Sequence, residues 1–343
     1  MTDIYILNLN YQVIGIVDNY SSAIFTRRYW ECGDFELYIK ANSKSLETLQ
    51  PEYYIQRDGD TYLYVIESIL LSTSQEDGDY LTVKGRSIES MLDRRILFDH
   101  RKEDLLKPYT IGGFNVEYSN DTCKTVEGCI RHALEMTIAP TDLNPYGVQW
   151  AWDANFTLGT LQGFSETMPQ TQILGTYLYD FVVEQCQTYG YGFRVHLNDD
   201  NKFEFNLYKG KDCSYSQKDN PYIVFSPEFD NLSNTSYLFD TTNYKNYAYS
   251  IGKSDLEEER MWNSRQVQNG RDVNRILRRE QFTDSSSISK ETKDTNGNSI
   301  AISDTKYAMY IGQNAYSELL KSPITETFDG DIVSNNMKYS LGD

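Results

Sequence analysis

The sequence has few of the residues from which metal and catalytic sites are usually built. Its three histidines, His100, His132 and His196, lie in different segments, and its five cysteines include no Cys-x-x-Cys pair. No two of these residues stand at a spacing typical of zinc ligands. We therefore predict no metal, no cofactor, and cysteines that are reduced and mostly buried.

Long apolar runs and basic charge are also scarce. No stretch approaches the roughly 20 apolar residues of a membrane-spanning helix, and residues 1–5 carry an acid where a signal peptide carries basic residues. We expect neither a membrane-spanning segment nor a cleaved signal. Fifty acidic residues against 32 basic residues give a formal charge of −18, which disfavours tight binding to a phosphate backbone. The acidic excess fits either solubility or a negative channel wall to which DNA does not adhere, and composition leaves both open.

Recognisable catalytic motifs are missing as well. The chain contains no Gly-x-Ser-x-Gly sequence, no Walker-type loop and no dinucleotide fingerprint. Residues 294–298 place their glycine at position four where a calcium loop needs it at position six, and they fit an Asn-Gly turn better. Trp150 and Trp152 beside Asp153 could stack on a sugar ring, but alternating aromatics on a strand more often face a core or a partner. We assign no catalytic residue and expect a protein that is not an enzyme.

Aromatic residues, by contrast, are abundant. The chain has 28 Tyr and 15 Phe, and this composition favours half-buried strands. A length of 343 residues predicts two or three domains. Strand-like runs fill residues 3–40, 53–69 and 80–83, with an Asp-Gly turn at residues 58–60 that predicts a tight hairpin. Ile88, Met91 and Leu92 then recur at helical spacing, so we predict an antiparallel β unit over residues 1–100 that ends in a short helix.

The pattern changes after residue 100. Apolar residues recur at helical spacing over residues 125–137 and 172–188, and a hairpin is expected over residues 191–197 and 203–208. These features predict an α+β unit over residues 101–215. Strands return at residues 222–225, 236–239, 246–251 and 273–282, followed by a polar loop at residues 284–304 that should be mobile. Tyr307, Ile311, Ala315 and Leu319 then predict a helix inside a second β unit over residues 216–343.

Three clusters of motifs, in a fixed order, carry a resemblance to a known family. The first is an opening strand pair with a glycine turn, the second is a strand followed by Gly-Arg and a short helix, and the third ends in two Gly-Asp pairs. They comprise residues 18–20, 27–29 and 33–37; residues 83–87 and 91–95; and residues 225–227, 231–232, 243–246, 278–280, 328–332 and 341–343. Together they resemble the siphophage baseplate hub, or tail-associated (Tal-like), protein family, which is similar to the hubs of contractile phage tails.

The resemblance implies a fold and a role. It implies a β-dominated α+β fold in which two antiparallel β-barrel-like tube domains, at residues 1–100 and 216–343, flank an α+β insertion at residues 101–215. Similar proteins continue with further strands, so the second tube domain is expected to be incomplete at its C-terminus. The implied role is that of a structural hub at the tail tip of a bacteriophage virion, made in the host cytoplasm. There a homotrimer would close or extend the tail tube as a ring of six β units.

The resemblance also implies partners. They are the distal tail and tail-tube proteins, the tape measure protein and the receptor-binding tip proteins, with DNA passing through the channel without specific binding. Two other function classes stay open on the residues alone. These are a tail-associated enzyme that degrades cell-wall polymers and a carbohydrate-binding β protein.

Six charged residues in the matching motifs are candidates for subunit-interface contacts, namely Arg86, Arg94, Arg95, Arg278, Arg279 and Glu280. In a hub, these arginines would pair with acids of a neighbouring chain. The alternative is ordinary turn and helix-end chemistry for the first three residues and a surface ion pair for the last three.

Overall fold

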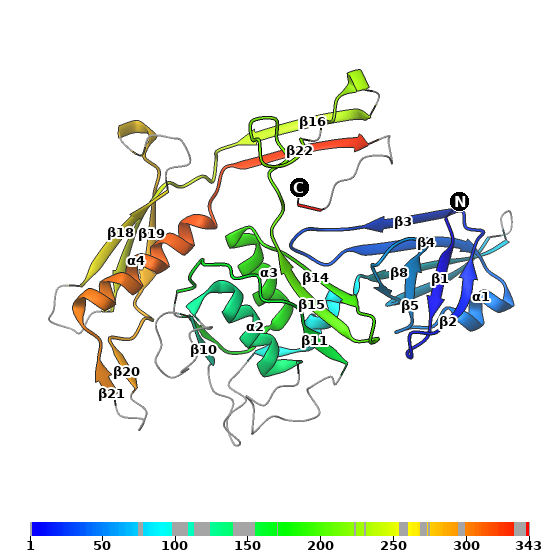
Figure 1. The fold of residues 1–343 in the computed structure, drawn as a ribbon, viewed down its shortest axis with the longest axis horizontal. Helices are drawn as coiled ribbons and strands as arrows, with labels where there is room; N and C mark the ends of the chain where they lie inside the picture. Colours follow the sequence, from blue (N-terminus) through cyan, green and yellow to red (C-terminus); the bar gives the residue numbers. More distant parts are fainter. Residues whose placement is uncertain are drawn as a thin grey trace.

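The computed structural model describes residues 2–74, 78–97, 109–112, 124–139, 155–169, 171–222, 224–229, 231–253, 260–267, 273, 275–293, 299–332 and 341–342. Figure 1 shows strand-rich parts at two ends of the molecule, with a part that contains helices between them. The fold is α+β and β-dominated, as the sequence predicted, with several mostly antiparallel sheets and few helices. No helix within these described ranges is long and apolar enough to span a membrane.

Two antiparallel sheets of four strands each form the N-terminal part. The first sheet has the order β2 (Val13–Val17), β1 (Ile4–Leu7), β5 (Tyr54–Arg57), β6 (Tyr64–Val65). The second has the order β3 (Ser22–Thr26), β4 (Asp34–Lys40), β8 (Gly78–Arg86), β7 (Ser68–Ser74). Phe35, Leu37 and Ile39 are buried on alternate positions of β4, so one face of the second sheet packs against Ile4 and Ile6 of the first.

The edges of these sheets are open in the described residues. Hydrogen bonds close neither sheet into a barrel there, and β2, β3 and β7 each have one unpaired side. A short helix, α1 (Ser43–Thr48), follows β4 and begins with a capping box between Asn42 and Ser45. A hairpin forms between β5 and β6 around residues 58–60, but its pairing ends at Ile55 and Tyr64, so the loop is longer than the tight turn that the Asp-Gly sequence predicted.

A short helix and a strand connect the N-terminal sheets to the middle of the chain. The helix predicted near residue 88 is η1 (Ile88–Arg94), a 3-10 helix. The strand that follows, β9 (Ile96–Leu97), pairs with β13 (Thr176–Tyr177), and β10 (Tyr109–Ile111) pairs with β12 (Thr171–Ile173).

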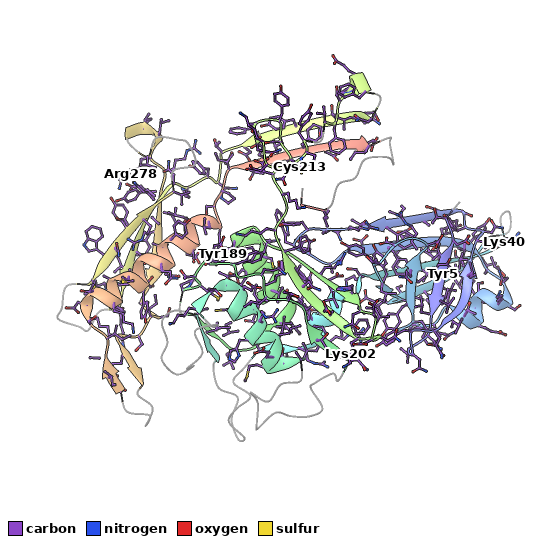
Figure 2. The ribbon with its side chains drawn as sticks, viewed as in Figure 1. Tyr5, Lys40, Tyr189, Lys202, Cys213 and Arg278 are labelled. Atoms are coloured by element: carbon purple, nitrogen blue, oxygen red, sulfur yellow. The ribbon has the colours of Figure 1, made fainter. Side chains whose placement is uncertain are left out.

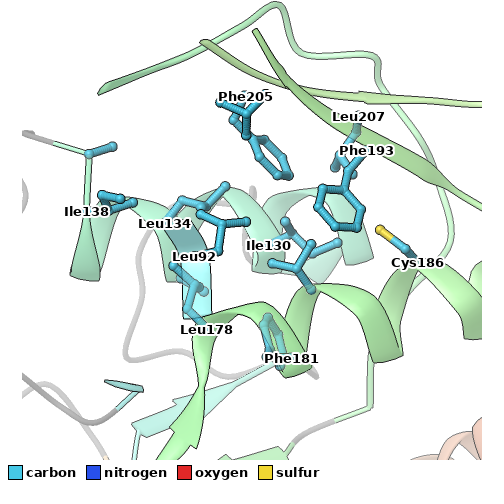
Figure 3. Packing of buried hydrophobic residues seen from close by; sticks show 14 of the residues in the cluster. Leu92, Ile130, Leu134, Ile138, Leu178, Phe181, Cys186, Phe193, Phe205 and Leu207 are labelled. Carbon is cyan, nitrogen blue, oxygen red and sulfur yellow. The ribbon is translucent and has the colours of Figure 1, made fainter. Parts of the chain in front are cut away.

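Two helices and a three-stranded sheet form the middle part. The helices are α2 (Val126–Thr137) and α3 (Leu178–Tyr189), and the sheet has the order β11 (Phe156–Leu158), β15 (Phe203–Tyr208), β14 (Gly192–Leu197). The hairpin of β14 and β15 was predicted, whereas β11 pairs with β15 in parallel. Figure 3 shows how Ile130 and Leu134 of α2, Phe181 of α3 and Phe193 and Phe205 of the sheet pack in one core.

The prediction for the second helix was wrong at its start. We expected the helix over residues 172–188, but it begins at Leu178, because the residues before it pair as β12 and β13. Gly175, with φ of 78°, makes the turn between these strands in a left-handed conformation that suits glycine. Leu174 and Tyr177, which the helical pattern placed on a packed face, are exposed instead.

The C-terminal part contains a covered sheet, a projecting ribbon and a hairpin. The sheet has the order β18 (Trp262–Gln266), β17 (Tyr247–Gly252), β19 (Glu280–Ser285), and helix α4 (Asp304–Leu320) lies on one of its faces (Figure 1). The ribbon pairs β16 (Leu232–Asp240) with β22 (Thr325–Ile332), and the hairpin pairs β20 (Glu291–Lys293) with β21 (Ser299–Ala301). The predicted helix around Tyr307 and Ile311 is confirmed, and both side chains are buried.

Three expectations for this part were wrong in detail. Strand β19 runs parallel to β17 because the chain crosses over between β18 and β19. Of the strand expected at residues 222–225, the described residues are not in a strand, and the strand expected at 273–282 begins only at Glu280, after the 3-10 turn η5 (Arg275–Leu277). The polar segment at 284–304, expected to be a mobile loop, contains the hairpin of β20 and β21, while residues 294–298 lie outside the described residues.

Candidate assembly surfaces

The first three candidate interface residues lie close to the end of β8 and in η1, where each has a partner in its own chain. Arg86 donates from Nε and Nη2 to Glu67, with the shortest contact at 2.9 Å, and from Nη1 to Asp93 at 3.2 Å. These bonds with Glu67 and Asp93 raise the pKa of Arg86. Arg94 pairs with Glu52 at 2.8 Å, and Arg95 Nη1 donates to the carbonyl of Arg94.

The other three candidates lie at the start of β19. The Arg278 guanidinium stacks on Tyr247, with 3.6 Å between Cζ and the ring centroid, and its Nε lies 2.7 Å from a Glu280 oxygen. Arg278 also donates to the Tyr249 hydroxyl. The main-chain N–H of Arg279 donates to Asn246 Oδ1 at 2.7 Å.

The structure does not bring the two groups together. Figure 2 shows Arg278 at one end of the molecule and Tyr5 and Lys40, in the N-terminal sheets that carry Arg86, at the other. Any subunit contact that uses both groups would therefore involve two different ends of the chain.

Arg278 belongs to a larger surface, which we call the aromatic face: Tyr247, Tyr249, Trp262 and Phe282, on the side of the sheet opposite α4. The register places Tyr249 beside Phe282, and their neighbours Ala248 and Ser250 point the other way and are buried. Trp262 is 60% exposed and Phe282 63% exposed. An exposed Trp next to half-buried Tyr side chains and an arginine has the composition of protein-binding hot spots. Sequence reasoning missed this face, although Tyr247 and Tyr249 alternate along a predicted strand.

A second exposed surface is the pair β16 and β22, which we call the ribbon. Its register places Tyr237, Phe239 and Phe328 on one side and Asp240 and Asp329 on the other. Tyr237 and Phe328 are 60% and 57% exposed. The two strands contain four acids and no lysine or arginine. In the described part of the chain, no third strand pairs with either strand of the ribbon (Figure 1).

The titratable groups of the middle part serve its own packing. His132 of α2 lies 3.6 Å from Glu135, and burial lowers the pKa of His196 on β14. His100, Cys123, Trp150, Trp152 and residues 294–298 lie outside the described residues. Within the part that the structure describes, no three His, Cys, Asp or Glu side chains are arranged to hold a metal ion.

Two buried carboxylates were not anticipated from the sequence. Glu127, at the start of α2, is 1% exposed and accepts the N–H groups of Gln162, Gly163 and Phe164 at 2.6 to 2.9 Å. Glu89 of η1 is 3% exposed and accepts the N–H of Val195 at 3.0 Å. Both carboxylates bind main-chain groups of another segment, so the geometry assigns them to holding the chain together.

Comparison with solved structures finds partial matches to phage tail proteins. Prophage tail protein gp18 from Listeria monocytogenes EGD-e is 15% identical, with a TM-score of 0.48 over 83% of this chain and 73% of that chain. The tail protein from Neisseria meningitidis MC58 is 10% identical, with a TM-score of 0.43 over 83% and 72% of the two chains. The 43 kDa tail protein of prophage MuSo2 from Shewanella oneidensis is 12% identical, with a TM-score of 0.44 over 84% and 74%.

The family is established by a match along the chain itself. No curated protein matches the sequence. A family model described as Siphovirus ReqiPepy6 Gp37-like protein matches residues 3–343, which confirms the siphophage resemblance drawn from the ordered motifs. The chain therefore belongs to the Siphovirus ReqiPepy6 Gp37-like protein family.

Proposed function

We propose that this protein is a structural baseplate hub at the tip of a bacteriophage tail, where three chains form a ring. Membership of a siphovirus family supports a place in the virion. The observation that carries the proposal is the aromatic face, because a sheet that exposes Trp262, Phe282 and an arginine stacked on tyrosine has the composition of a surface that another protein covers.

The arrangement of sheets supports two tube domains per chain. Open sheets lie in residues 2–97 and in residues 231–332, on either side of the α+β part. In the ring, residues 1–100 and 216–343 form the two barrel-like tube domains and residues 101–215 the insertion, and strands of neighbouring chains cover the open edges. The six charged candidates, Arg278 to Glu280 foremost, lie at or next to these contacts.

Charge defines a further part of the proposal. The chain carries a net charge of −18, and acids that line the bore of the ring keep DNA from adhering as it passes. Screening at physiological salt limits this effect to roughly 8 Å, so the acids must lie at the bore itself. In this role the hub contacts the distal tail or tail-tube proteins, the tape measure protein and the receptor-binding tip proteins, and it acts without catalysis.

The test of the ring is the mass of the protein in solution together with an image of the assembled tail tip. We expect a closed three-fold ring around the tail axis. Replacing Trp262→Ser and Phe282→Ser together should reduce incorporation into tail tips, whereas Leu161→Ser, which removes a similarly exposed apolar side chain from the middle part, should not. A chain that stays monomeric and lies off the tail axis would overturn the proposal.

Catalysis is tested separately. Substituting His100, His132 and His196 together should leave the effect of purified tail tips on cell-wall polymers unchanged. Loss of a wall-degrading activity in a stably folded triple variant would mean that the protein is an enzyme.

A further inference from the structure

The ribbon has an aromatic face that the described part of its own chain leaves largely exposed. A two-stranded ribbon alone is marginally stable in water, and it gains stability when one face packs on other apolar groups. Here Tyr237, Phe239 and Phe328 stand together on one face, each at least 45% exposed. The partner that covers this face therefore needs an apolar surface that is neutral or basic, because the ribbon itself is acidic.

The N-terminal sheets contain a groove with these properties, which we call the β2 groove. It has a volume of about 350 Å³ and lies between β2 and α1, with Ile6, Val17 and Ile39 among its lining residues. Ile16 of β2, which also lines it, is 49% exposed. The outer side of β2 is a free sheet edge in the described residues.

The charges at the β2 groove are complementary to those of the ribbon. Lys40 and Lys44 line the groove together with one acid, Asp18. Both lysines are exposed, and neither forms an ion pair with any described residue. In a chain with 50 acids, two exposed lysines that pair with no described acid, beside an apolar groove, form a site that an acidic, aromatic segment fits.

We propose that the ribbon of one chain docks along β2 of a second copy, with Phe328 and Tyr237 over the β2 groove and Glu326 beside Lys40 and Lys44. This inference rests on the proposed ring and names the two surfaces that form it. Glu326 lies on the aromatic side of the ribbon, where it accepts the Tyr237 hydroxyl at 2.6 Å. Asp240 and Asp329 then face away from the contact, which supplies acids for the bore.

A second copy is the occupant because of where the two surfaces lie. The ribbon and the β2 groove are unlike surfaces on different parts of one chain: Figure 1 shows the ribbon above the middle part and α1 at the outer end of the N-terminal sheets, and Figure 2 labels Lys40 at that end. A contact between unlike surfaces repeats from chain to chain, and when three such contacts complete one full turn it closes into a ring in which every ribbon and every groove is used. It also joins a C-terminal β unit to an N-terminal one, which is the alternation that a ring of six units requires.

The first experiment measures the concentration at which the trimer dissociates. Glu326→Lys alone, and Lys40→Glu with Lys44→Glu, should each weaken association by roughly 30-fold, because like charges then face one another across the contact. A chain that carries all three substitutions should recover much of the affinity, since the charges are then exchanged. Lys202→Glu, at the turn between β14 and β15, is the control for the change in net charge and should have no effect.

The second experiment works in the assembled tail tip, whether or not the isolated chain associates. A chain with Ile16→Cys and Phe328→Cys should form covalent dimers and trimers on oxidation, and either single cysteine variant should not form the same species. Absence of these species in assembled tips, or a trimer that resists the charge reversals, would overturn the docking while the ring itself stands. A chain that is monomeric in the tail tip as well as in solution would overturn the ring, and the docking with it.

Discussion

The buried carboxylate of Glu127 provides a quantitative test of how the middle part is held together. It stands in the first turn of α2 and receives three main-chain N–H groups from residues 162–164, at 2.6, 2.8 and 2.9 Å. With 1% of the residue exposed, water cannot replace the carboxylate without entering the core. We therefore expect this residue to fix the segment that leads from β11 toward β12.

The expected cost follows from the number of donors. A hydrogen bond to a charged group contributes about 1.5–3 kcal/mol, and a buried donor left without an acceptor costs about 1–3 kcal/mol. Glu127→Gln keeps one acceptor oxygen but turns an NH₂ group toward at least one N–H, so it should lower the free energy of unfolding by about 2 kcal/mol. Glu127→Ala removes all three acceptor contacts. Because water can partly reach the segment once the side chain is gone, the free energy of unfolding should fall by about 4 kcal/mol and not by the full sum of the three bonds.

The assay combines urea denaturation with amide hydrogen exchange at residues 162–164. Exchange at these amides should rise roughly tenfold for each 1.4 kcal/mol lost. Glu228→Gln and Glu228→Ala, at an exposed position in η4 (Pro227–Phe229), are the matched controls and should change neither measurement. If Glu127→Ala unfolds within about 1 kcal/mol of the parent chain and leaves the three amides protected, the carboxylate does not hold this segment.

Three further predictions concern stability. Burial raises the pKa of Glu89. Its protonated form therefore stabilises the fold below the ordinary glutamate pKa, and this contribution is lost as pH rises. Glu89→Gln, which cannot ionise, should be more stable than the parent chain at pH ~8 but not at pH ~4. Although burial opposes it, the hydrogen bond from Lys209 lowers the pKa of Glu166 to about 2. Glu166→Gln should therefore lose about 1 kcal/mol at neutral pH, a screened value for a part-exposed pair, and this loss should fade as pH falls from ~4.3 to 2. Asn246 is fully buried and forms hydrogen bonds with main-chain groups of residues 277 and 279. Asn246→Ala should lower the free energy of unfolding by about 2 kcal/mol and expose η5 to proteases.

Each of these three has a distinct contrary result. The urea midpoint of Glu89→Gln could differ from that of the parent chain by the same amount at both pH values. That result would show that ionisation of Glu89 does not affect stability. A Glu166→Gln deficit that persists at pH 2 would assign its effect to packing instead of charge. Unchanged proteolysis of Asn246→Ala near residue 277 would show that other contacts hold η5.

The sequence predicted the elements in which the spacing of apolar residues fits only one type of secondary structure. Along β4, Phe35, Leu37 and Ile39 alternate with more exposed residues, and a two-residue period over this length is typical of a strand with one buried face. Likewise, the four-residue spacing from Tyr307 to Leu319 predicted α4, because all of these side chains are needed on the side that covers the sheet.

The errors arose where two local patterns compete or where contacts come from distant segments. Residues 173–177 fit a helical face, yet they form strands because β9 and β10 offer them partners that no local pattern reveals. The parallel pairing of β17 with β19 depends on a crossover, which spacing does not encode. Glu127 and Glu89 read as ordinary surface acids, since their acceptor roles depend on N–H groups that are 35 and 106 residues away at the nearest.

Charged and aromatic residues differ in how much they can contribute to assembly. Arg86 already binds Glu67 and Asp93, and Arg278 already lies against Tyr247 and Glu280, so a neighbouring chain that recruited these arginines would have to compete with bonds inside the chain. An exposed ion pair contributes at most about 1 kcal/mol, which leaves little to gain from exchanging one partner for another. Trp262 and Phe328, in contrast, lose no existing contact when they are covered, and the exposed part of their apolar area contributes to association. In the proposed ring, we therefore expect the arginines to shape and orient the surfaces, and the exposed aromatic side chains to supply most of the energy that joins one chain to the next.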